Sequence, residues 1–191
     1  VRRWPRGHLV VRGLIGAVIP GPAAVETGTD LRDDAAAAIA LVGADPRAAY
    51  ERAEAVLASV GRSRSLQAAE CRSMAYRAAG LALAELADLA GAQVQLQRAV
   101  RAAAGELFAA DGLRRFAATT SSNLALLAAM SGRNAEALLL LQRAEDEFDG
   151  VEGPVFWLTR ADVAMRAGLD DEAHTLTLRA CDWLSAHGTG W

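Results

Sequence analysis

The residues in this sequence that could do chemistry are three histidines, two cysteines and scattered carboxylates, and their spacing decides what they can do. His174 follows Asp170 and Asp171 by four and three residues, so all three could share one side of a helix. Such a set could bind a metal ion, but acidic residues in the first turn of a helix also complement the helix dipole. The dipole interpretation needs no ligand, and we expect no metal site here.

Enzyme motifs are absent from the sequence. HExxH, CxxC and Gly-x-Ser-x-Gly do not occur, and a phosphate-binding loop ending in Gly-Lys is impossible because all 20 basic residues are arginine. Two short glycine pairs, at 13–16 and 188–190, lack the strand and helix that a nucleotide-binding loop needs. We therefore expect a protein that is not an enzyme, with no catalytic residue and no cofactor.

The cysteines and the charge narrow the class of protein further. Cys71 and Cys181 are far apart and lie in apolar helical patterns, so we expect two buried, unreactive thiols in a cytoplasmic protein. The formal net charge of -3, with 23 carboxylates among the arginines, argues against nucleic acid as a partner. Apolar runs are too short to cross a bilayer, and we expect no membrane contact.

Residues 1–29 differ in composition from the rest of the chain. Three arginines precede an apolar segment that ends near Ala23, an arrangement typical of a secretory signal. Arg12 interrupts that segment, and several glycines and prolines would break a helix there. We interpret residues 1–29 as a loosely ordered leader and residues 30–191 as the folded domain.

From residue 30 onward, helical stretches alternate with glycine-marked breaks, and no run alternates as a strand does. The stretches 131–144 and 167–180 share a Gly, a Glu-Ala pair, a Leu and a closing Arg-Ala at identical spacing. The position at which a helix gives way to a turn, which we call the turn slot, is occupied by Gly43, Ala87, Gly132 and Gly168. Successive turn slots are 44, 45 and 36 residues apart. Such spacings predict stacked helical hairpins, because one hairpin cannot bury its apolar face alone.

Each turn slot is followed by two alanines seven residues apart. Glycine in the slot predicts a left-handed C-terminal cap, and Asp45–Pro46, Asn134 and Asp170 are good signals for the start of the next helix. Seven residues make two helical turns, so both alanines lie on one face, where a neighbouring helix can approach closely. The pairs are Ala48/Ala55, Ala92/Ala99, Ala137/Ala144 and Ala173/Ala180. The glycines expected to end the second helices are Gly61, Gly112 and Gly150.

This pattern resembles the tetratricopeptide repeat (TPR) family, in which a large residue, a small-Gly step and a turn precede Ala, a large apolar residue and Ala. The second copy follows it through Tyr76, Ala79–Gly80, Leu83, Asp88, Ala92, Leu96 and Ala99. In the first and fourth copies, Arg52 and Thr177 stand where the large apolar residue belongs. The resemblance covers residues 30–186 and implies an all-α fold, a right-handed superhelical solenoid of about four helical hairpins.

The resemblance also implies a protein-protein interaction module that binds a peptide or helix in the concave groove lined by the first helices. The residues expected there in the middle copies are Arg77, Leu81, Glu85, Ser122, Asn123, Leu126 and Met130. In some family members this groove clamps a terminal carboxylate, but only Arg77 and Asn123 have suitable chemistry here, so a full clamp is not expected. The leucines and Met130 could instead be core, because apolar stripes at helical spacing usually are.

An alternative function follows from a narrower likeness. Long-period arrays similar to this one flank caspase-like (CHAT-type) peptidase domains, or form sensor segments of large transcription regulators, in GC-rich bacteria. The chain would then be a regulatory or sensor array whose effector domain is not in this chain. Neither interpretation identifies the partner or the oligomeric state.

Overall fold

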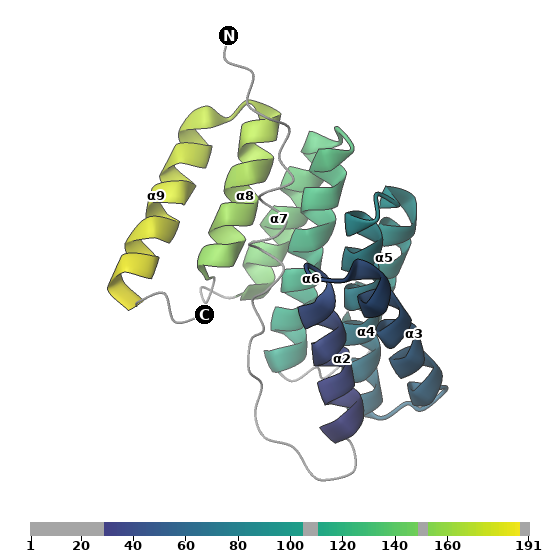
Figure 1. Cartoon of the computed structure of the whole chain (residues 1–191). Helices are drawn as coiled ribbons and strands as arrows, with labels where there is room; N and C mark the ends of the chain where they lie inside the picture. Colours follow the sequence, from purple (N-terminus) through teal and green to yellow (C-terminus); the bar gives the residue numbers. More distant parts are fainter. Residues whose placement is uncertain (1–28, 105–110, 149–152, 188–191) are drawn as a thin grey trace.

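The computed structural model describes residues 29–104, 111–148 and 153–187, and every element within these ranges is a helix (Figure 1). The helices are α2 (Thr29–Leu41), α3 (Pro46–Val60), α4 (Leu66–Glu85), α5 (Leu89–Ala104), α6 (Asp111–Met130), α7 (Asn134–Phe148), α8 (Pro154–Ala167) and α9 (Asp170–His187). The prediction of an all-helical protein is confirmed. Most of the expected leader, residues 1–28, lies outside the described residues, and Thr29 already begins α2.

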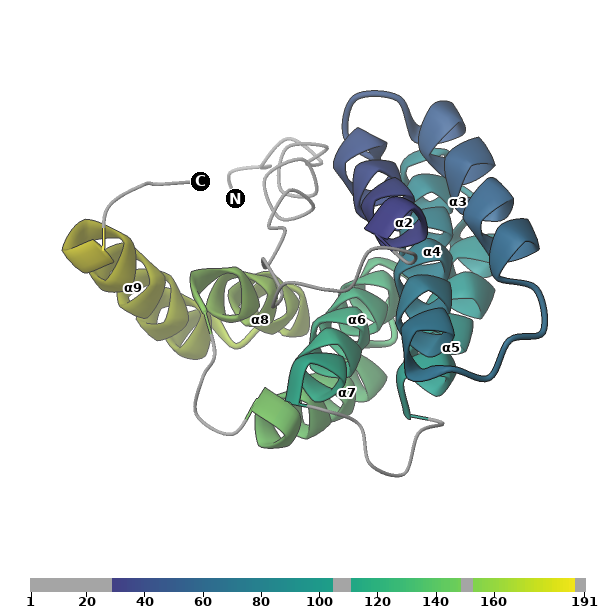
Figure 2. The same cartoon turned by 90° about the horizontal axis from the view of Figure 1, so that it is seen from below.

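The helices pack in the order in which they follow one another. Each helix contacts the next one along the chain, and the first helices of successive pairs also touch, α2 with α4, α4 with α6 and α6 with α8. Seen from below, the pairs follow an arc, with α2 and α6 toward its inner side and α3 and α7 toward its outer side (Figure 2). At the end of this order, α9 packs mainly against α8.

Three of the turns within helix pairs have a residue in the left-handed conformation at the equivalent position. Gly132 and Gly168 have φ of 77° and 78°, as predicted, and Ala87 has φ of 65° in the equivalent place. The residue after each bonds back across the turn; for example, the Asp88 N–H donates to the Leu83 carbonyl at 2.9 Å. These bonds close the last turn of the first helix, and Ala87 adopts the conformation although its Cβ makes it unfavourable.

The turn of the first pair is built differently, and the prediction for Gly43 is wrong. Gly43 is not among the residues with positive φ. The turn spans residues 42–45, one residue more than 86–88 in the second pair, and the Asp45 N–H donates to the Leu41 carbonyl at 2.8 Å. The Asp45 carboxylate then caps α3 by accepting from Ala48 N at 3.0 Å, and Pro46 is the first helical residue.

The start of the second helix, not the glycine, sets which residues become buried. In every second helix the first buried alanine donates its N–H to the carbonyl of the residue just before the helix: Ala49 to Asp45, Ala92 to Asp88, Ala137 to Arg133 and Ala173 to Leu169. Positions four, seven and eleven residues further on lie on the same face as that alanine. The resulting stripes are Ala49/Ala53/Val56/Val60, Ala92/Leu96/Ala99/Ala103, Ala137/Leu141/Ala144/Phe148 and Ala173/Thr177/Ala180/Leu184.

The expected alanine pairs can now be judged. Six of the eight predicted alanines, those of the second, third and fourth pairs, are buried. In the first pair the prediction is wrong by one residue, because the longer turn shifts the stripe: Ala48 is half-buried and Ala55 is exposed. Arg52 accordingly points outward to an ion pair with Asp34, and Ala53 takes the stripe position instead.

The second pair contains a close helix contact at a glycine. A Cβ added at Gly80 of α4 would lie 2.7 Å from Leu96 Cγ and 3.1 Å from the Ala92 carbonyl oxygen of α5. Only a residue without a side chain permits this approach, and Leu96 fills the space at 1% exposure.

Two of the three expected helix ends can be checked. Gly61 caps α3, and its N–H donates to the Leu57 carbonyl. The prediction for Gly112 is wrong, because Gly112 lies within α6 and not at the end of a second helix. Gly150 lies outside the described residues.

Candidate partner-binding site

Arg77 of α4 and Asn123 of α6, the two residues with chemistry suited to a polar ligand group, are in contact. Arg77 Nε donates a hydrogen bond to Asn123 Oδ1 at 3.2 Å. The guanidinium carbon of Arg77 also lies 5.3 Å from the centre of the Phe116 ring, which offers a cation–π contact. The fold therefore joins two predicted site residues that are 46 positions apart in the sequence.

The electrostatic environment of Arg77 is unusual for an arginine. Arg77 is only 6% exposed, and no carboxylate in the described part of the chain forms an ion pair with it. Burial lowers the pKa of Arg77 to about 10, so the side chain is still a cation at neutral pH. A buried cation without a matching anion costs free energy, which an incoming anionic group would recover.

Glu85 lies two helical turns beyond Arg77 on α4. Its Oε1 atom is buried and has no hydrogen-bond partner. Eight residues of helix place the two charged groups on the same side, about 12 Å apart along the axis. Arg77 and Glu85 are thus a cation and a carboxylate about 80° apart around α4, within one broad side of the helix.

The apolar residues predicted for this site are placed differently from one another. Leu81 lies between Arg77 and Glu85 but belongs to a core cluster that includes Leu96. Leu126 of α6 is buried at 7% exposure, whereas Met130, the last residue of α6, is 38% exposed. Leu81 therefore serves the core, and Met130 is the exposed apolar side chain of the set.

Ser122 cannot act as a free donor in this arrangement. It is buried, and its hydroxyl donates to the Ala118 carbonyl one turn earlier in α6 at 3.0 Å. The partner-binding role of the seven predicted residues stays a prediction. Within this set, Arg77 is a buried cation without an ion-pair partner in the described residues, Glu85 has an unpaired Oε1 atom, and Met130 is exposed.

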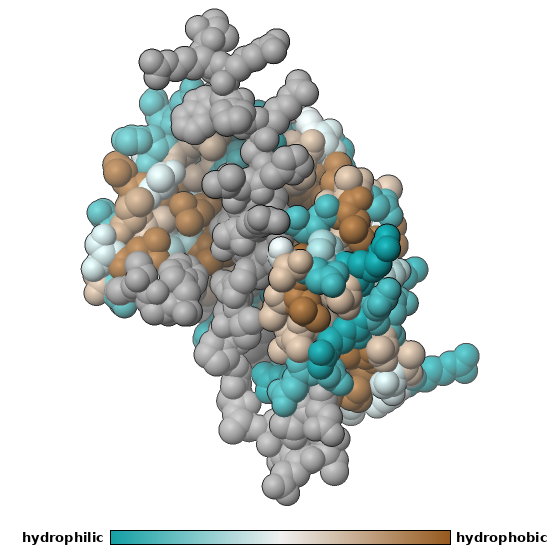
Figure 3. All heavy atoms as spheres, in the orientation of Figure 1, coloured by the Kyte–Doolittle hydropathy of each residue, from teal (hydrophilic) through white to brown (hydrophobic). Residues whose placement is uncertain are grey.

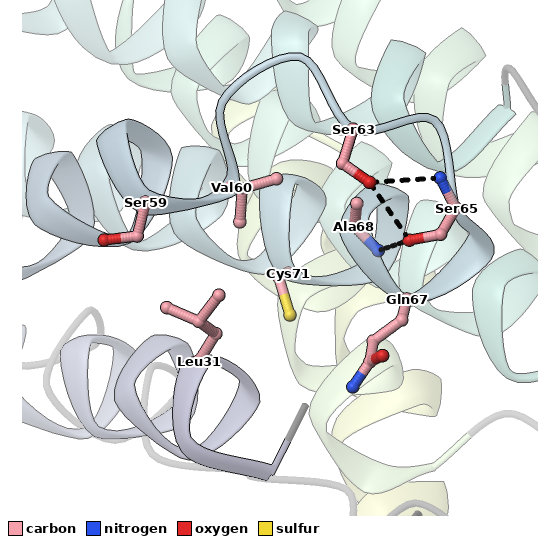
Figure 4. A pocket seen from close by; sticks show the side chains of 8 residues that line it. All are labelled: Leu31, Ser59, Val60, Ser63, Ser65, Gln67, Ala68 and Cys71. Atoms are coloured by element: carbon pink, nitrogen blue, oxygen red, sulfur yellow. Dashed lines mark hydrogen bonds between the residues drawn. The ribbon is translucent and has the colours of Figure 1, made fainter. Parts of the chain in front are cut away.

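A separate small pocket of about 170 Å³ lies among α2, α3, α4 and the loop before α4. The Cys71 thiol lies between Leu31 and Gln67 in this pocket (Figure 4). The nearby hydroxyls are already used, since Ser65 caps α4 by accepting from Ala68 N and also pairs with Ser63. Its lining residues carry no charge: Leu31, Ser59, Val60, Ser63, Ser65, Gln67, Ala68 and Cys71.

The two cysteines have different environments. Cys71 is buried, as predicted, and burial raises the pKa of its thiol, so it is a poor nucleophile at neutral pH. The prediction that Cys181 is buried is wrong, because Cys181 is exposed on α9. The apolar periodicity around Cys181 concealed this, since α9 buries only Ala173 and Ala180 completely.

Two further features do not occur among the described residues. No three side chains of His, Cys, Asp and Glu in those ranges gather closely enough to hold a metal ion. In the same ranges, no helix combines the length and the apolar character needed to cross a membrane.

Comparison with known proteins adds no relative: no family model, curated protein or solved structure matches the chain.

Sequence reasoning missed the unpaired carboxylate oxygen of Glu85 and the cation–π contact of Arg77 with Phe116. No sequence signal could have found either feature, because both depend on how α4 packs against its neighbouring helices.

Proposed function

We propose that the protein is a TPR-like interaction module, a right-handed superhelical solenoid that holds a peptide or helix of another protein on the side lined by its first helices. Two findings support the solenoid. The stripe that begins at the carbonyl before each second helix recurs in all four pairs. The pairs also follow an arc, as stacked hairpins of this kind do (Figure 2).

The observation that carries the binding proposal is the buried guanidinium of Arg77. It has an amide oxygen and an aromatic ring as neighbours, and no carboxylate of the described chain balances its charge. An acidic side chain or terminal carboxylate of a partner supplies that charge, and Asn123 holds the guanidinium in place for it. Charge-assisted hydrogen bonds of this type are about twice as strong as neutral ones.

A second contact, at Glu85, specifies the charge pattern that we expect in the partner. The unpaired Oε1 of Glu85 accepts from a basic side chain about 12 Å from the acidic one, a separation of two turns in a helix. Met130 adds an exposed, adaptable apolar contact at the end of α6. The preferred ligand is therefore an amphipathic helix with an acidic and a basic residue eight positions apart and apolar residues between them.

A regulatory array would use the same surface, with the ligand helix supplied by the effector domain that the array restrains. The chemistry of recognition at Arg77 and Glu85 is then unchanged, and only the covalent origin of the ligand differs. Binding of short helices in solution tests both versions.

The test is a selection of peptides from a random display library on the immobilised chain, followed by calorimetric titration of the enriched sequences. Arg77→Met removes the buried cation and keeps most of its volume. Arg98→Met is the matched control, because Arg98 is an exposed arginine that also lies over an aromatic ring, 5.9 Å from the centre of Tyr76.

We expect enriched peptides to carry an acidic residue and to lose affinity by about 10-fold or more in Arg77→Met, since a charged hydrogen bond contributes roughly 1.5–3 kcal/mol. Arg98→Met should bind as the parent does. Thermal stability of Arg77→Met should be unchanged or higher, because a buried unpaired charge has been removed. Peptides that bind Arg77→Met as tightly as the parent would remove Arg77 from the proposal.

A further inference from the structure

The contacts of Arg77 leave one edge of its guanidinium group for a ligand. Nε donates to Asn123 Oδ1 at 3.2 Å, and the guanidinium carbon lies over the Phe116 ring, 5.3 Å from its centre. Neither Nη1 nor Nη2 donates a hydrogen bond to the described residues. The edge formed by Nη1 and Nη2 can therefore hold two oxygens of an anionic group.

The positive charge of Arg77 stands by itself in a buried environment. The side chain is 6% exposed, and no carboxylate of the described residues forms an ion pair with it. Burial lowers the pKa of Arg77, and no charged neighbour in the same part of the chain contributes to the shift. A ligand at this site thus meets one cation and little water.

The other arginines of α4, α5 and α6 are in a different situation. Hydrophilic surface (teal) is prominent over the α2–α3 side of the molecule, where charged side chains contact water (Figure 3). Arg72 of α4 donates to the Ser63 carbonyl. Because water weakens the field of an exposed charge, the arginines of α5 and α6 add little at Arg77. All of them are exposed: Arg98, Arg101, Arg114 and Arg115.

A buried site of this kind is sensitive to the number of charges that a ligand brings. The free energy needed to take an ion out of water rises with the square of its charge, whereas its attraction to one cation rises only in proportion to its charge. A second negative charge therefore raises the cost about fourfold and the gain about twofold. A carboxylate carries one charge at neutral pH, and a phosphate monoester carries nearly two.

We infer that the Arg77 site accepts a singly charged carboxylate of the partner and rejects a doubly charged phosphate group. The inference rests on the proposed peptide-binding function and deepens it, because it states which anionic group the partner offers. Recognition of phosphorylated peptides uses clusters of arginines, and α4 supplies a single buried one here. Phosphorylation of the partner at the acidic position would accordingly release it and not recruit it.

Asn123→Asp supplies the missing negative charge from the chain itself. The substitution keeps the shape of the side chain and makes the oxygen that accepts from Arg77 Nε part of a carboxylate. Arg77 is then already paired, so an incoming carboxylate meets the excess of negative charge that a phosphate meets in the parent.

A nuclear magnetic resonance titration of the whole chain tests the inference with small probes, read at the Nε–H signals of its arginines. N-acetylglutamate amide offers a side-chain carboxylate, and N-acetylalanine offers a terminal one. N-acetylphosphoserine amide offers a phosphate, and N-acetylglutamine amide is the uncharged control. The signal of the exposed Arg98 is the internal control. Both signals are assigned through bonds in the parent, so the central comparison needs no variant to fold.

We expect at least one carboxylate probe to shift the Arg77 signal with a dissociation constant in the millimolar range, and to leave the Arg98 signal unchanged. The phosphoserine probe should bind about 10-fold more weakly or less, and the glutamine probe should not bind. The carboxylate probe that binds more tightly shows whether the site prefers an acidic side chain or a chain terminus. Asn123→Asp should weaken binding of that probe by about 10-fold or more.

Three results would overturn the inference: a phosphoserine probe that binds Arg77 as tightly as the carboxylates, carboxylates that do not bind there, or undiminished carboxylate binding in a folded Asn123→Asp variant. The interaction-module function fails separately. A chain that follows these charge rules but enriches no peptide from the display library would refute that function alone, and a chain that captures phosphorylated peptides through Arg77 would refute only the charge rule.

Discussion

Helices α5 and α9 occupy the same place in their pairs and differ in how much of the stripe they bury. In α5, Leu96 is 1% exposed beneath Gly80, with α4 on one side and α6 on the other. In α9, Thr177 occupies the stripe position of Leu96 and is exposed, and α8 is the main neighbour. The stripes of α5 and α9 thus begin at the same position, but the stripe of α5 is enclosed between two helix pairs, whereas the stripe of α9 is covered mainly by α8.

The largest effect that separates the two helices should come from the central stripe residue. Leu96→Ala leaves a cavity under Gly80 and should lower the free energy of unfolding by about 2–5 kcal/mol. Thr177→Ala, at the exposed equivalent, should change it by less than about 0.5 kcal/mol. Urea denaturation followed by circular dichroism measures both, and equal losses would mean that the two stripes are packed alike.

The next effect comes from the close approach in the second pair. Gly80→Ala places a Cβ 2.7 Å from Leu96 Cγ and should destabilise the protein by about 1–3 kcal/mol. The double variant Gly80→Ala/Leu96→Ala should lose less than the sum of the two single variants, because the truncated side chain makes room for the added methyl group. Strict additivity in the same urea titrations would show that the two positions do not touch.

A smaller effect of opposite sign is expected in the turns of these pairs. Ala87→Gly relieves a left-handed alanine and should raise the free energy of unfolding by about 1 kcal/mol, whereas Gly168→Ala should lower it by about the same amount. Both changes are read from the shift in melting temperature. If the two variants shift it in the same direction, the turns do not share one conformation.

Ion pairs should contribute no more than these turns. Arg160 of α8 bridges Glu145 of α7 and Glu172 of α9, so Arg160→Ala should cost about 1 kcal/mol and loosen the last pair. Arg52→Ala breaks an exposed ion pair with Asp34 and should cost less than about 0.5 kcal/mol. Added salt should shrink the Arg52 effect, and a loss that salt does not alter would argue against an electrostatic origin.

Local chemistry explains which parts of the fold could be predicted from the sequence. The turn slots at Ala87, Gly132 and Gly168 and the alanine pairs that follow them depend on a few neighbouring residues, and all were predicted. Gly43 failed because Asp45 and Pro46 fix the start of α3 one residue later than a count from the glycine implies. Counting from the helix start would have placed Ala49, not Ala48, in the stripe.

The candidate site was less accessible to such reasoning. Helix periodicity places Arg77, Leu81 and Glu85 on one side of α4, but it does not say that α6 brings Asn123 to Arg77 or that Leu81 enters the core. Those facts depend on the distance and angle between α4 and its neighbouring helices, which are set by packing between residues far apart in the sequence. The exposure of Cys181 likewise follows from the absence of a helix over α9 among the described residues, which no local pattern reveals.

Hydrogen exchange with mass spectrometry tests most directly whether α5 is enclosed more fully than α9, although the stripes of both helices begin at the same position. We predict that amides around Leu96 exchange only as fast as global unfolding allows, whereas those around Thr177 exchange through local opening at a much lower free energy. Equal protection of α5 and α9 would contradict this prediction, because it would require α9 to be as fully enclosed as α5.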